Sequence, residues 1–262
     1  MTLKYAILAT EGANDQAAIS KVLRTFGLES FKGNKKNLDA FWLDIIPRRK
    51  DTDNLYDHEH MHMPRFFTSR THSVAVYQGH GSELPQNLSD LMTLYPSYTY
   101  DIHALGIIVD ADNYQPGVVV KKYVDKLQPF FPAISSTPGT IAINHTSSEG
   151  IPRIGVYVLP DNEKTGTLDS ILVECADCVY PEHKVGAEVF LDSVNSTHKG
   201  HWKPFDREKA VIATIVSVIH PGIANTLSIA RDNWICDQTV STIVSVAAMY
   251  KFIGDLLDLP IR

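Results

Sequence analysis

Short apolar runs alternate with segments of helical spacing along most of the chain. The runs at 5–10, 72–78 and 103–109 each lead into a turn, which is followed by apolar residues three or four positions apart. A short continuous run is typical of a strand covered on both faces, and the wider spacing is typical of a helix that buries one face. Strands that alternate with helices predict an α/β protein with a mainly parallel central sheet flanked by helices.

The first predicted helix covers about 14–27, where Asn14 or Asp15 would serve as the N-cap and Gly27 as the stop. Pro116 is placed to start another helix. The remaining helices before residue 205 and one hairpin of two strands follow from the same spacing and turn signals. The helices are expected at 83–98, 116–131 and 165–180, and the hairpin strands at 139–146 and 153–161.

Two regions depart from this alternation. Residues 32–70 are rich in lysine and histidine and predict a mostly irregular insertion with one strand at 40–46. Residues 206–262 have helical spacing, interrupted at His220-Pro221-Gly222. We therefore expect an α/β domain at 1–205 and a helical C-terminal region that packs on the same domain.

Composition narrows the class of protein. Of the 262 residues, 44% are hydrophobic, which is enough for a sizeable core and excludes global disorder. The net charge of -6 lacks the basic character of a protein that holds DNA by phosphate neutralisation alone. No apolar run reaches about 18 residues and the N-terminus has no secretory pattern, so a cytoplasmic protein without a membrane span is expected. Three cysteines do not describe a disulfide framework.

Acidic residues follow three of the predicted strands. Glu11 and Asp15 follow the first, Asp110 and Asp112 follow the strand at 103–109, and Asp161 follows the hairpin. Ligands of open α/β sheets bind beyond the carboxyl ends of the strands, so these side chains are expected to converge. Closely packed carboxylates repel one another unless a cation is present. The sequence therefore predicts a site for Mg²⁺ or Mn²⁺, which take hard oxygen ligands.

Each acidic residue also has a structural interpretation. Glu11 and Asp15 would suit the first turn of a helix, where capping and the helix dipole favour acids. Asp110 and Asp112 would suit a polar turn, but a turn does not require two acids after a buried strand. Asp161 fits a turn and a metal site equally well. Function is thus favoured mainly by Asp110 and Asp112.

The motifs Glu11-Gly-Ala-Asn-Asp15 and Asp110-Ala-Asp112 resemble the two signatures of the TOPRIM domain, which occurs in topoisomerases, primases and OLD-type nucleases. In overall layout the chain resembles DUF3226, a bacterial family of TOPRIM-like proteins, over nearly its whole length. This resemblance implies a TOPRIM- or Rossmann-like fold. It rests further on VDAD at 109–112, LPDNEKTGTLDSIL at 159–172, Lys209-Ala210 and His220-Pro221-Gly222.

The resemblance implies roles for the acidic residues. Glu11 would be a general acid or base or a metal ligand, Asp110 and Asp112 catalytic metal ligands, and Asp15 a further ligand. The LPDNEKTGTLD segment contributes to a second metal in OLD-like enzymes. Its acidic residues here are Asp161, Glu163 and Asp169. Ser170 follows where relatives more often have a second acid, which leaves open whether one or two metals bind.

The implied function is metal-dependent phosphodiester hydrolysis on nucleic acid, with DNA as the expected substrate. An alternative is a non-catalytic or partner-dependent subunit that binds metal or nucleotide within an ATPase-containing assembly. The resemblance implies that the ATPase is separately encoded, since no GxxxxGK[ST] P-loop occurs in this sequence. A homo-oligomer is compatible with both. No tyrosine can be assigned as a topoisomerase nucleophile.

Four further motifs are weaker. His58, His60 and His62 suggest a metal site but fit a solvated loop better, and the pair Cys175 and Cys178 is expected to serve packing. The segment 79–82, GHGS, fits a phosphate cradle and a simple turn equally well. Basic residues of the insertion are candidates for contacts with a DNA backbone, although such a charge run is usually a solvated face. They are Lys32, Lys35, Lys36, Arg48, Arg49, Lys50 and Arg65.

Overall fold

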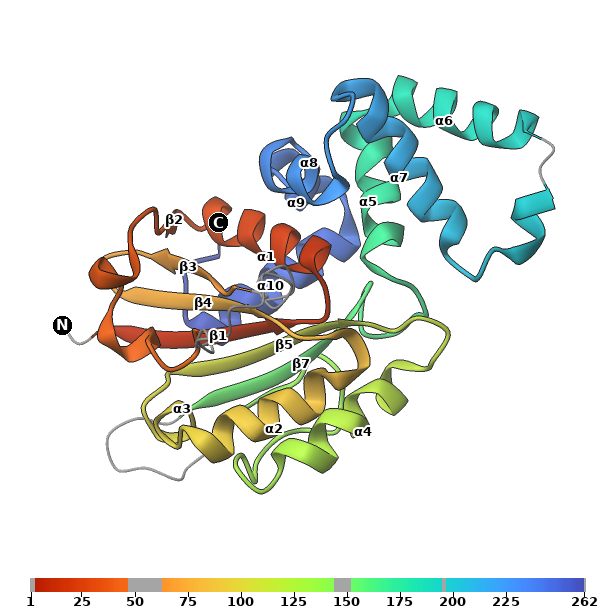
Figure 1. The fold of residues 1–262 in the computed structure, drawn as a ribbon. Coiled ribbons are helices and arrows are strands. Elements are labelled where there is room, and N and C mark those ends of the chain that lie inside the picture. The colour runs from red at the N-terminus through yellow and green to blue at the C-terminus, as the bar shows by residue number, and fades with distance from the viewer. Residues whose placement is uncertain (1–2, 47–62, 144–151, 195–196, 262) are drawn as a thin grey trace, which may run out of the picture.

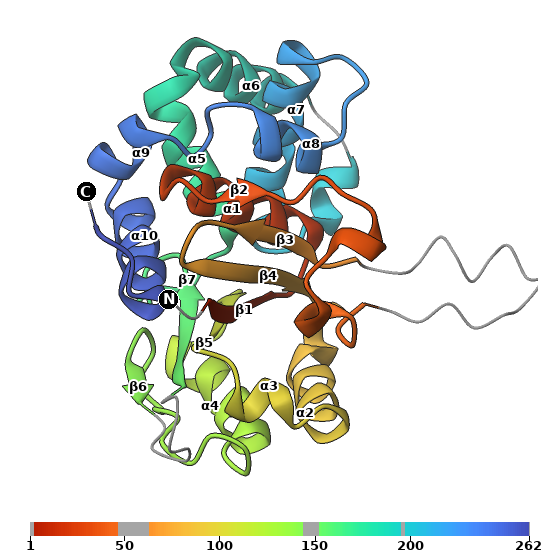
Figure 2. The same cartoon turned by 90° about the vertical axis from the view of Figure 1, so that its left-hand side faces the viewer.

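A single sheet lies at the centre of the molecule, between two layers of helices (Figures 1 and 2). The computed structural model describes residues 3–46, 63–143, 152–194 and 197–261, and within them seven strands are ordered β2-β3-β4-β1-β5-β7-β6. These strands are β1 (Lys4–Thr10), β2 (Glu29–Ser30), β3 (Arg65–Thr68), β4 (His72–Gln78), β5 (Ala104–Asp110), β6 (Ile141–Ile143) and β7 (Arg153–Leu159).

The four inner strands, β4, β1, β5 and β7, run parallel, and the outer strands β2, β3 and β6 pair antiparallel with their neighbours. The predicted α/β fold with a mainly parallel sheet is therefore confirmed. The predicted hairpin is also present, since β6 pairs with β7.

Side chains of the inner strands alternate between two hydrophobic cores. In β1, Ala6 and Leu8 belong to one core, whereas Ile7 and Ala9 belong to the other. All four are buried. The continuous apolar sequence of β1 is explained by this cover of helices on both faces.

One face of the sheet carries α2, α3 and α4, and the other carries α1 and α10, with α5 to α9 grouped next to them (Figures 1 and 2). On the first face the helices are α2 (Leu84–Leu94), α3 (Ser97–Tyr100) and α4 (Pro116–Leu127). The others are α1 (Ala13–Thr25), α5 (Leu168–Val179), α6 (Pro181–Ser193), α7 (Asp206–Ile219), α8 (Asn225–Arg231), α9 (Asp237–Thr242) and α10 (Val244–Leu257).

Helix α10 lies directly on the sheet because two paired glycines make room for it. Gly106 of β5 is opposite Gly155 of β7. A Cβ on Gly106 would lie 2.5 Å from Cδ2 of Leu256, and one on Gly155 would lie 2.9 Å from Cε2 of Phe252. The helical C-terminal region is thus packed into the core around the sheet. The division of the chain at residue 205 stays a prediction.

The strand expected at 40–46 is wrong. Residues Ala40–Trp42 form one turn of 3-10 helix, and Trp42 is buried with its Nε1 donating a hydrogen bond of 2.8 Å to Oγ of Ser73. The Trp42 ring lies edge-on to that of Phe41, so aromatic packing explains the apolar residues here without an extended strand.

Two helix boundaries also differ from expectation. The N-cap of α1 is Gly12, not Asn14 or Asp15. The helix expected at 83–98 is broken into α2 and α3, with Pro96 as the N-cap of α3. Helix α6 was not predicted. Among the helices of the described residues, none combines the length and apolar character needed to cross a bilayer.

Candidate functional site

The register of the inner strands brings the predicted acidic motifs to one edge of the sheet. Thr10, the last residue of β1, is opposite Ile108 of β5. Glu11 follows β1 at once, and Asp110 is the last residue of β5. Because these neighbouring strands are parallel, Glu11 and Asp110 lie at the same carboxyl edge.

Asp15 is held at this edge by the first turn of α1. Its Oδ2 accepts a hydrogen bond of 2.8 Å from the backbone N–H of Gly12, the N-cap. An acid at this third helical position is favoured by the cap and by the helix dipole. Asp15 is only 8% exposed. The residue therefore stabilises the start of α1 and also places a buried carboxylate beside the strand ends.

The turn of Asp110-Ala-Asp112 is tied to the loop after β7. Asp112 has φ 49°, a left-handed conformation that aspartate tolerates better than most residues, and it exchanges backbone hydrogen bonds of 2.9 and 3.0 Å with Gly166. Gly166 has φ 151°, and a Cβ there would lie 2.9 Å from Cδ of Pro160. The N–H of Leu168 donates a hydrogen bond of 2.8 Å to Oδ1 of Asp110. These contacts fix the positions of both aspartates.

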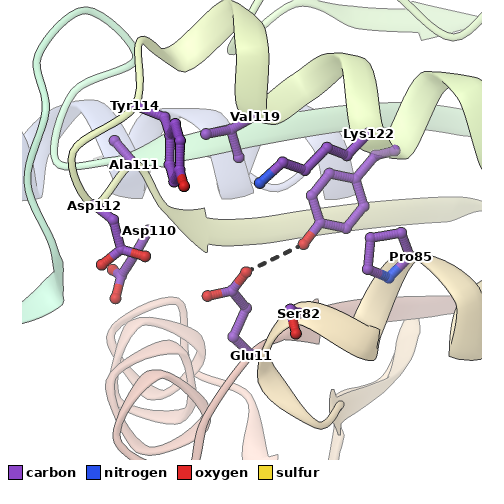
Figure 3. A pocket seen from close by; sticks show the side chains of 10 residues that line it. Glu11, Ser82, Pro85, Asp110, Ala111, Asp112, Tyr114, Val119 and Lys122 are labelled. Carbon is purple, nitrogen blue, oxygen red and sulfur yellow. Dashed lines mark hydrogen bonds between the residues drawn. The ribbon is translucent and has the colours of Figure 1, made fainter.

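Two pockets meet at Asp110. The first, which we call the α4 pocket, has a volume of about 440 Å³ and is lined by Glu11, Asp110 and Asp112 on one side (Figure 3). The second, the α1 pocket, has a volume of about 320 Å³ and is lined by Asp15, Asp110 and Asp169. Each pocket thus presents three carboxylates, and Asp110 belongs to both.

Sequence reasoning missed the wall of the α4 pocket that faces the carboxylates. There the hydroxyl of Tyr123 donates a hydrogen bond of 3.3 Å to Oε1 of Glu11, and Nζ of Lys122 lies 4.8 Å from the centre of the Tyr114 ring (Figure 3). Val119, Lys122 and Tyr123 are spaced three and four apart, so one face of α4 supplies them. The spacing of these three residues, in a helix that begins just after the DxD motif, could have predicted that they face the site. The other lining residues are Ser82, Pro85 and Ala111.

Burial and mutual repulsion raise the pKa values of the clustered acids. The pKa of Asp110 is raised well above its usual value by burial and by the charge of Asp15, against the hydrogen bond from Leu168. Burial also raises the pKa of Asp15, with contributions from Glu11 and Asp169. For Glu11, burial is again the largest cause, and the charge of Asp112 adds to it. The cluster is therefore electrostatically strained as a set of anions.

Little positive charge offsets this strain. Within the described residues, neither Asp15 nor Asp110 takes part in an ion pair. Lys122 lowers the pKa of Glu11 by its charge, but burial outweighs it. The pKa of Asp169 is raised by burial, and Lys209 opposes the shift.

Asp161 is the predicted ligand that the structure does not bring into the cluster. Its Oδ1 accepts hydrogen bonds from the N–H groups of Glu163 and Lys164, at 3.1 and 2.9 Å, and its Oδ2 lies 2.9 Å from Nζ of Lys164. Partial burial would raise its pKa, but these hydrogen bonds outweigh it and the net pKa is lowered. Asp161 lines neither pocket. Its carboxylate serves the turn after β7.

The GHGS segment leads from β4 into a turn of 3-10 helix at Gly81–Glu83. The N–H of Gly79 donates to the carbonyl of Thr10 at 2.8 Å, and that of Gly81 donates to the carbonyl of Glu11 at 3.3 Å, so neither amide is available to a phosphate. A Cβ on Gly79 would lie 2.5 Å from Cδ1 of Leu84. Only Ser82 of this segment lines the α4 pocket.

Where the structure describes the residues of the other weak motifs, none of them lines either pocket. Cys175 is buried and Cys178 partly buried, both as free thiols. Lys32 and Lys36 are exposed and Arg65 is half-buried in β3. Other predicted residues lie outside the described residues, namely His58, His60, His62, Arg48, Arg49 and Lys50.

The donor set fits a hard divalent cation. Carboxylate oxygens are the ligands that Mg²⁺ and Mn²⁺ prefer, and a cation would relieve the repulsion in both pockets. Among the described residues, no group of three or more His, Cys, Asp or Glu side chains is placed so that it could hold a metal ion as it stands. Mg²⁺ is usually bound by only one or two carboxylates, with waters and substrate phosphates completing its shell.

The layout of the chain matches a family model for a protein of unknown function, DUF3226, over residues 5–247. The chain belongs to the DUF3226 family. Among curated proteins, none matches the sequence. A solved structure, that of hypothetical protein PH0156 from Pyrococcus horikoshii OT3, superposes with a TM-score of 0.54 at 13% sequence identity. The match covers 97% of this chain and 95% of the archaeal one. At this identity the likeness shows a shared fold for this DUF3226 protein and nothing further.

Proposed function

We propose that this DUF3226 protein is a TOPRIM-type hydrolase that cleaves phosphodiester bonds of nucleic acid with Mg²⁺ or Mn²⁺. The observation that supports it most is the meeting of two three-carboxylate pockets at Asp110. A single structural carboxylate would be explained by capping or by a turn. A cluster of five carboxylates, in which Asp15 is buried and Asp15 and Asp110 form no ion pair within the described residues, is better explained by a bound cation that in turn binds an anionic substrate.

The two pockets divide the carboxylates between two cations. One cation would be bound by Asp110 and Asp112 in the α4 pocket, with Glu11 beside it as a further ligand or as the acid or base. A second would be bound in the α1 pocket by one or two of Asp15, Asp110 and Asp169. When bound, the cations supply positive charge that lowers the pKa of an attacking water and neutralises the phosphate. Asp161 has no part in this proposal.

The protein's own residues position these carboxylates. The N–H of Leu168 donates to Oδ1 of Asp110, and the carboxylate keeps further lone pairs that can accept other ligands. Tyr123 donates to Oε1 of Glu11 and so limits the rotation of that side chain. Glu11, with a pKa raised by burial and by Asp112, is the residue we assign to accept or donate a proton in the reaction.

A second candidate is a subunit that acts only with a separately encoded ATPase. Val185, Val189 and Phe190 of α6 are each more than half exposed, and the first two are four residues apart on one face of the helix. An apolar face of this kind favours a protein partner. The partner-dependent assembly keeps the same carboxylate site.

Cleavage assays with the purified chain separate these candidates. Supercoiled and linear DNA, single-stranded DNA and RNA are incubated with Mg²⁺, Mn²⁺ or EDTA, using wild type, Asp110→Asn and the control Asp125→Asn, an exposed acid on α4. Metal-dependent cleavage that is lost in Asp110→Asn and kept in Asp125→Asn is the expected result. No cleavage of any substrate would refute an autonomous nuclease and favour the partner-dependent subunit.

A further inference from the structure

The α4 pocket has two chemically different walls. Glu11, Asp110 and Asp112 form the acidic wall, and Tyr114, next to Asp112, and Lys122, whose amine points toward the Tyr114 ring, form a second wall (Figure 3). A purely metal-binding hollow would need only the first wall. The second wall combines an aromatic ring with a cation, which are the two groups that bind the base and the phosphate of a nucleotide.

Tyr114 is presented to solvent immediately beside the acidic turn. The residue is 54% exposed, although its side chain is large and mostly hydrophobic. Its backbone N–H donates a hydrogen bond of 3.0 Å to the carbonyl of Ala111, so the turn that positions Asp110 and Asp112 also positions Tyr114. An exposed, well-anchored ring at a site that handles nucleic acid is suited to base stacking.

Lys122 is held only weakly in its present position. Its Nζ lies over the Tyr114 ring at 4.8 Å, and within the described residues it interacts with Glu11 by charge but forms no ion pair. A cation–π contact at an exposed site contributes about 0.5–1 kcal/mol, whereas stacking of a base on an aromatic side chain contributes about 1–3 kcal/mol. A nucleotide can therefore displace the ammonium from the ring, and the ammonium can then bind a phosphate.

The size of the pocket indicates whether it takes a single unpaired base or a base pair of a duplex. A volume of about 440 Å³ lies in the range of pockets that take one small-molecule unit. A base that is still stacked and paired in a duplex cannot place its face against Tyr114. Bases of single strands, loops and frayed ends can do so.

We propose that the α4 pocket receives one unstacked nucleotide of a single-stranded nucleic acid, with the base packed on Tyr114 and an adjacent phosphate bound by Lys122. The inference rests on the proposed function, because it takes the carboxylate wall as the reacting end of the pocket. It names the substrate class as single-stranded DNA or RNA, which share this chemistry.

Binding is measured apart from cleavage by fluorescence anisotropy. The probes are a labelled 12-mer of single-stranded DNA, its RNA counterpart and the matching DNA duplex, each with Ca²⁺ in place of Mg²⁺. The variants are Tyr114→Phe, Tyr114→Ala and Lys122→Met. Two matched controls are Tyr100→Ala, a tyrosine of α3 that is 51% exposed, and Lys121→Met, the neighbouring lysine on α4.

Wild type is expected to bind a single strand at least tenfold more tightly than the duplex. Tyr114→Ala should weaken single-strand binding roughly fivefold to 100-fold, Tyr114→Phe should retain it, and Tyr100→Ala should leave it unchanged. Lys122→Met should reduce the slope of log affinity against log salt by about 0.7, the value for one phosphate contact on a single strand, and Lys121→Met should not. Tighter binding of the DNA or of the RNA probe would show which of the two nucleic acids the pocket accepts.

Two outcomes separate this inference from the proposed function. Metal-dependent cleavage of duplex DNA that is indifferent to Tyr114→Ala, together with equal binding of duplex and single strand, would overturn the single-strand assignment and leave the hydrolase intact. Single-strand binding that depends on Tyr114, without cleavage in the presence of any metal, would support the pocket assignment and overturn the autonomous hydrolase. Equal effects of Tyr114→Ala and Tyr100→Ala would also overturn the assignment.

Discussion

The backbone N–H of Leu168 donates a hydrogen bond of 2.8 Å to Oδ1 of Asp110, 58 residues earlier in the chain. The bond joins the end of β5 to the first turn of α5 and holds one carboxylate oxygen at the point where the two pockets meet. A carboxamide at position 110 can keep this acceptor while it removes the negative charge. The structural role of Asp110 can thus be separated from its charge.

We predict that Asp110→Asn is more thermostable than wild type in EDTA and no longer responds to metal. Its charge is buried and repelled by Asp15, so its removal should raise the melting temperature by about 2–4 °C for each kcal/mol of relief. Mn²⁺ at about 100 times its Kd should stabilise wild type by about 2.7 kcal/mol. Scanning fluorimetry with and without Mn²⁺ measures both effects. An equal Mn²⁺ shift in the two proteins would contradict the assignment of Asp110 as a ligand.

Tyr123→Phe is expected to lower the cleavage rate roughly two- to tenfold and to raise the half-saturating Mn²⁺ concentration. The variant loses the hydrogen bond of 3.3 Å to Glu11, and such a bond contributes about 0.5–1.5 kcal/mol. Tyr5→Phe is the control, because it loses a hydroxyl bond to Asp39 at the start of β1. If both variants keep wild-type Mn²⁺ dependence, Tyr123 does not position Glu11.

Asp169→Asn and Asp161→Asn are predicted to differ sharply in cleavage assays. Asp169 lines the α1 pocket with Asp15 and Asp110, so loss of its charge should reduce the rate by tenfold or more if a second cation binds there. Asp161 is engaged by its own turn and by Lys164, and its replacement should change the rate less than about threefold, since surface ion pairs contribute about 0–1 kcal/mol. The opposite ranking would restore Asp161 as the ligand.

The four inner strands and the carboxylate edge could be predicted because they depend on local patterns, whereas the short outer strands β2 and β3 were not predicted. Continuous apolar runs such as Ala6–Ala9 require cover on both faces, and parallel neighbours place residues such as Glu11 and Asp110 at one edge whatever the details of packing. Asp161 shows the limit of this reasoning. A position directly after a strand does not show whether a carboxylate faces a pocket or accepts hydrogen bonds within its own turn.

Residues that act through tertiary contact could not be predicted in this way. Tyr123 meets Glu11 across 112 positions, and only the docking of α4 on the sheet brings them together. The segment 40–46 was misread because an apolar run looks the same whether it extends as a strand or packs as an aromatic cluster around Trp42. In both cases the deciding contacts are distant in sequence.

His103 provides the last prediction, which concerns acid stability at the opposite end of the sheet. Burial lowers its pKa from 6.5 to about 4, and the charges of Lys4 and Arg153 and the neighbouring His72 add to the shift, while Asp258 opposes it. Its Nε2 is buried without a hydrogen-bond partner, so no hydrogen bond at this atom stabilises the protonated ring in the folded state.

The unfolded chain therefore binds a proton at His103 below about pH 6.5, whereas the folded chain does so only below about pH 4. Stability contributed by the neutral ring is present above pH 6.5 and is lost as the pH falls through this window. As the pH is lowered from 7 to 4.5, the urea midpoint of wild type should therefore fall more than that of His103→Leu. His183→Leu, which replaces an exposed histidine, should keep a constant difference from wild type. A wild-type midpoint that tracks His103→Leu at every pH would show that this histidine titrates alike in the folded and unfolded chain.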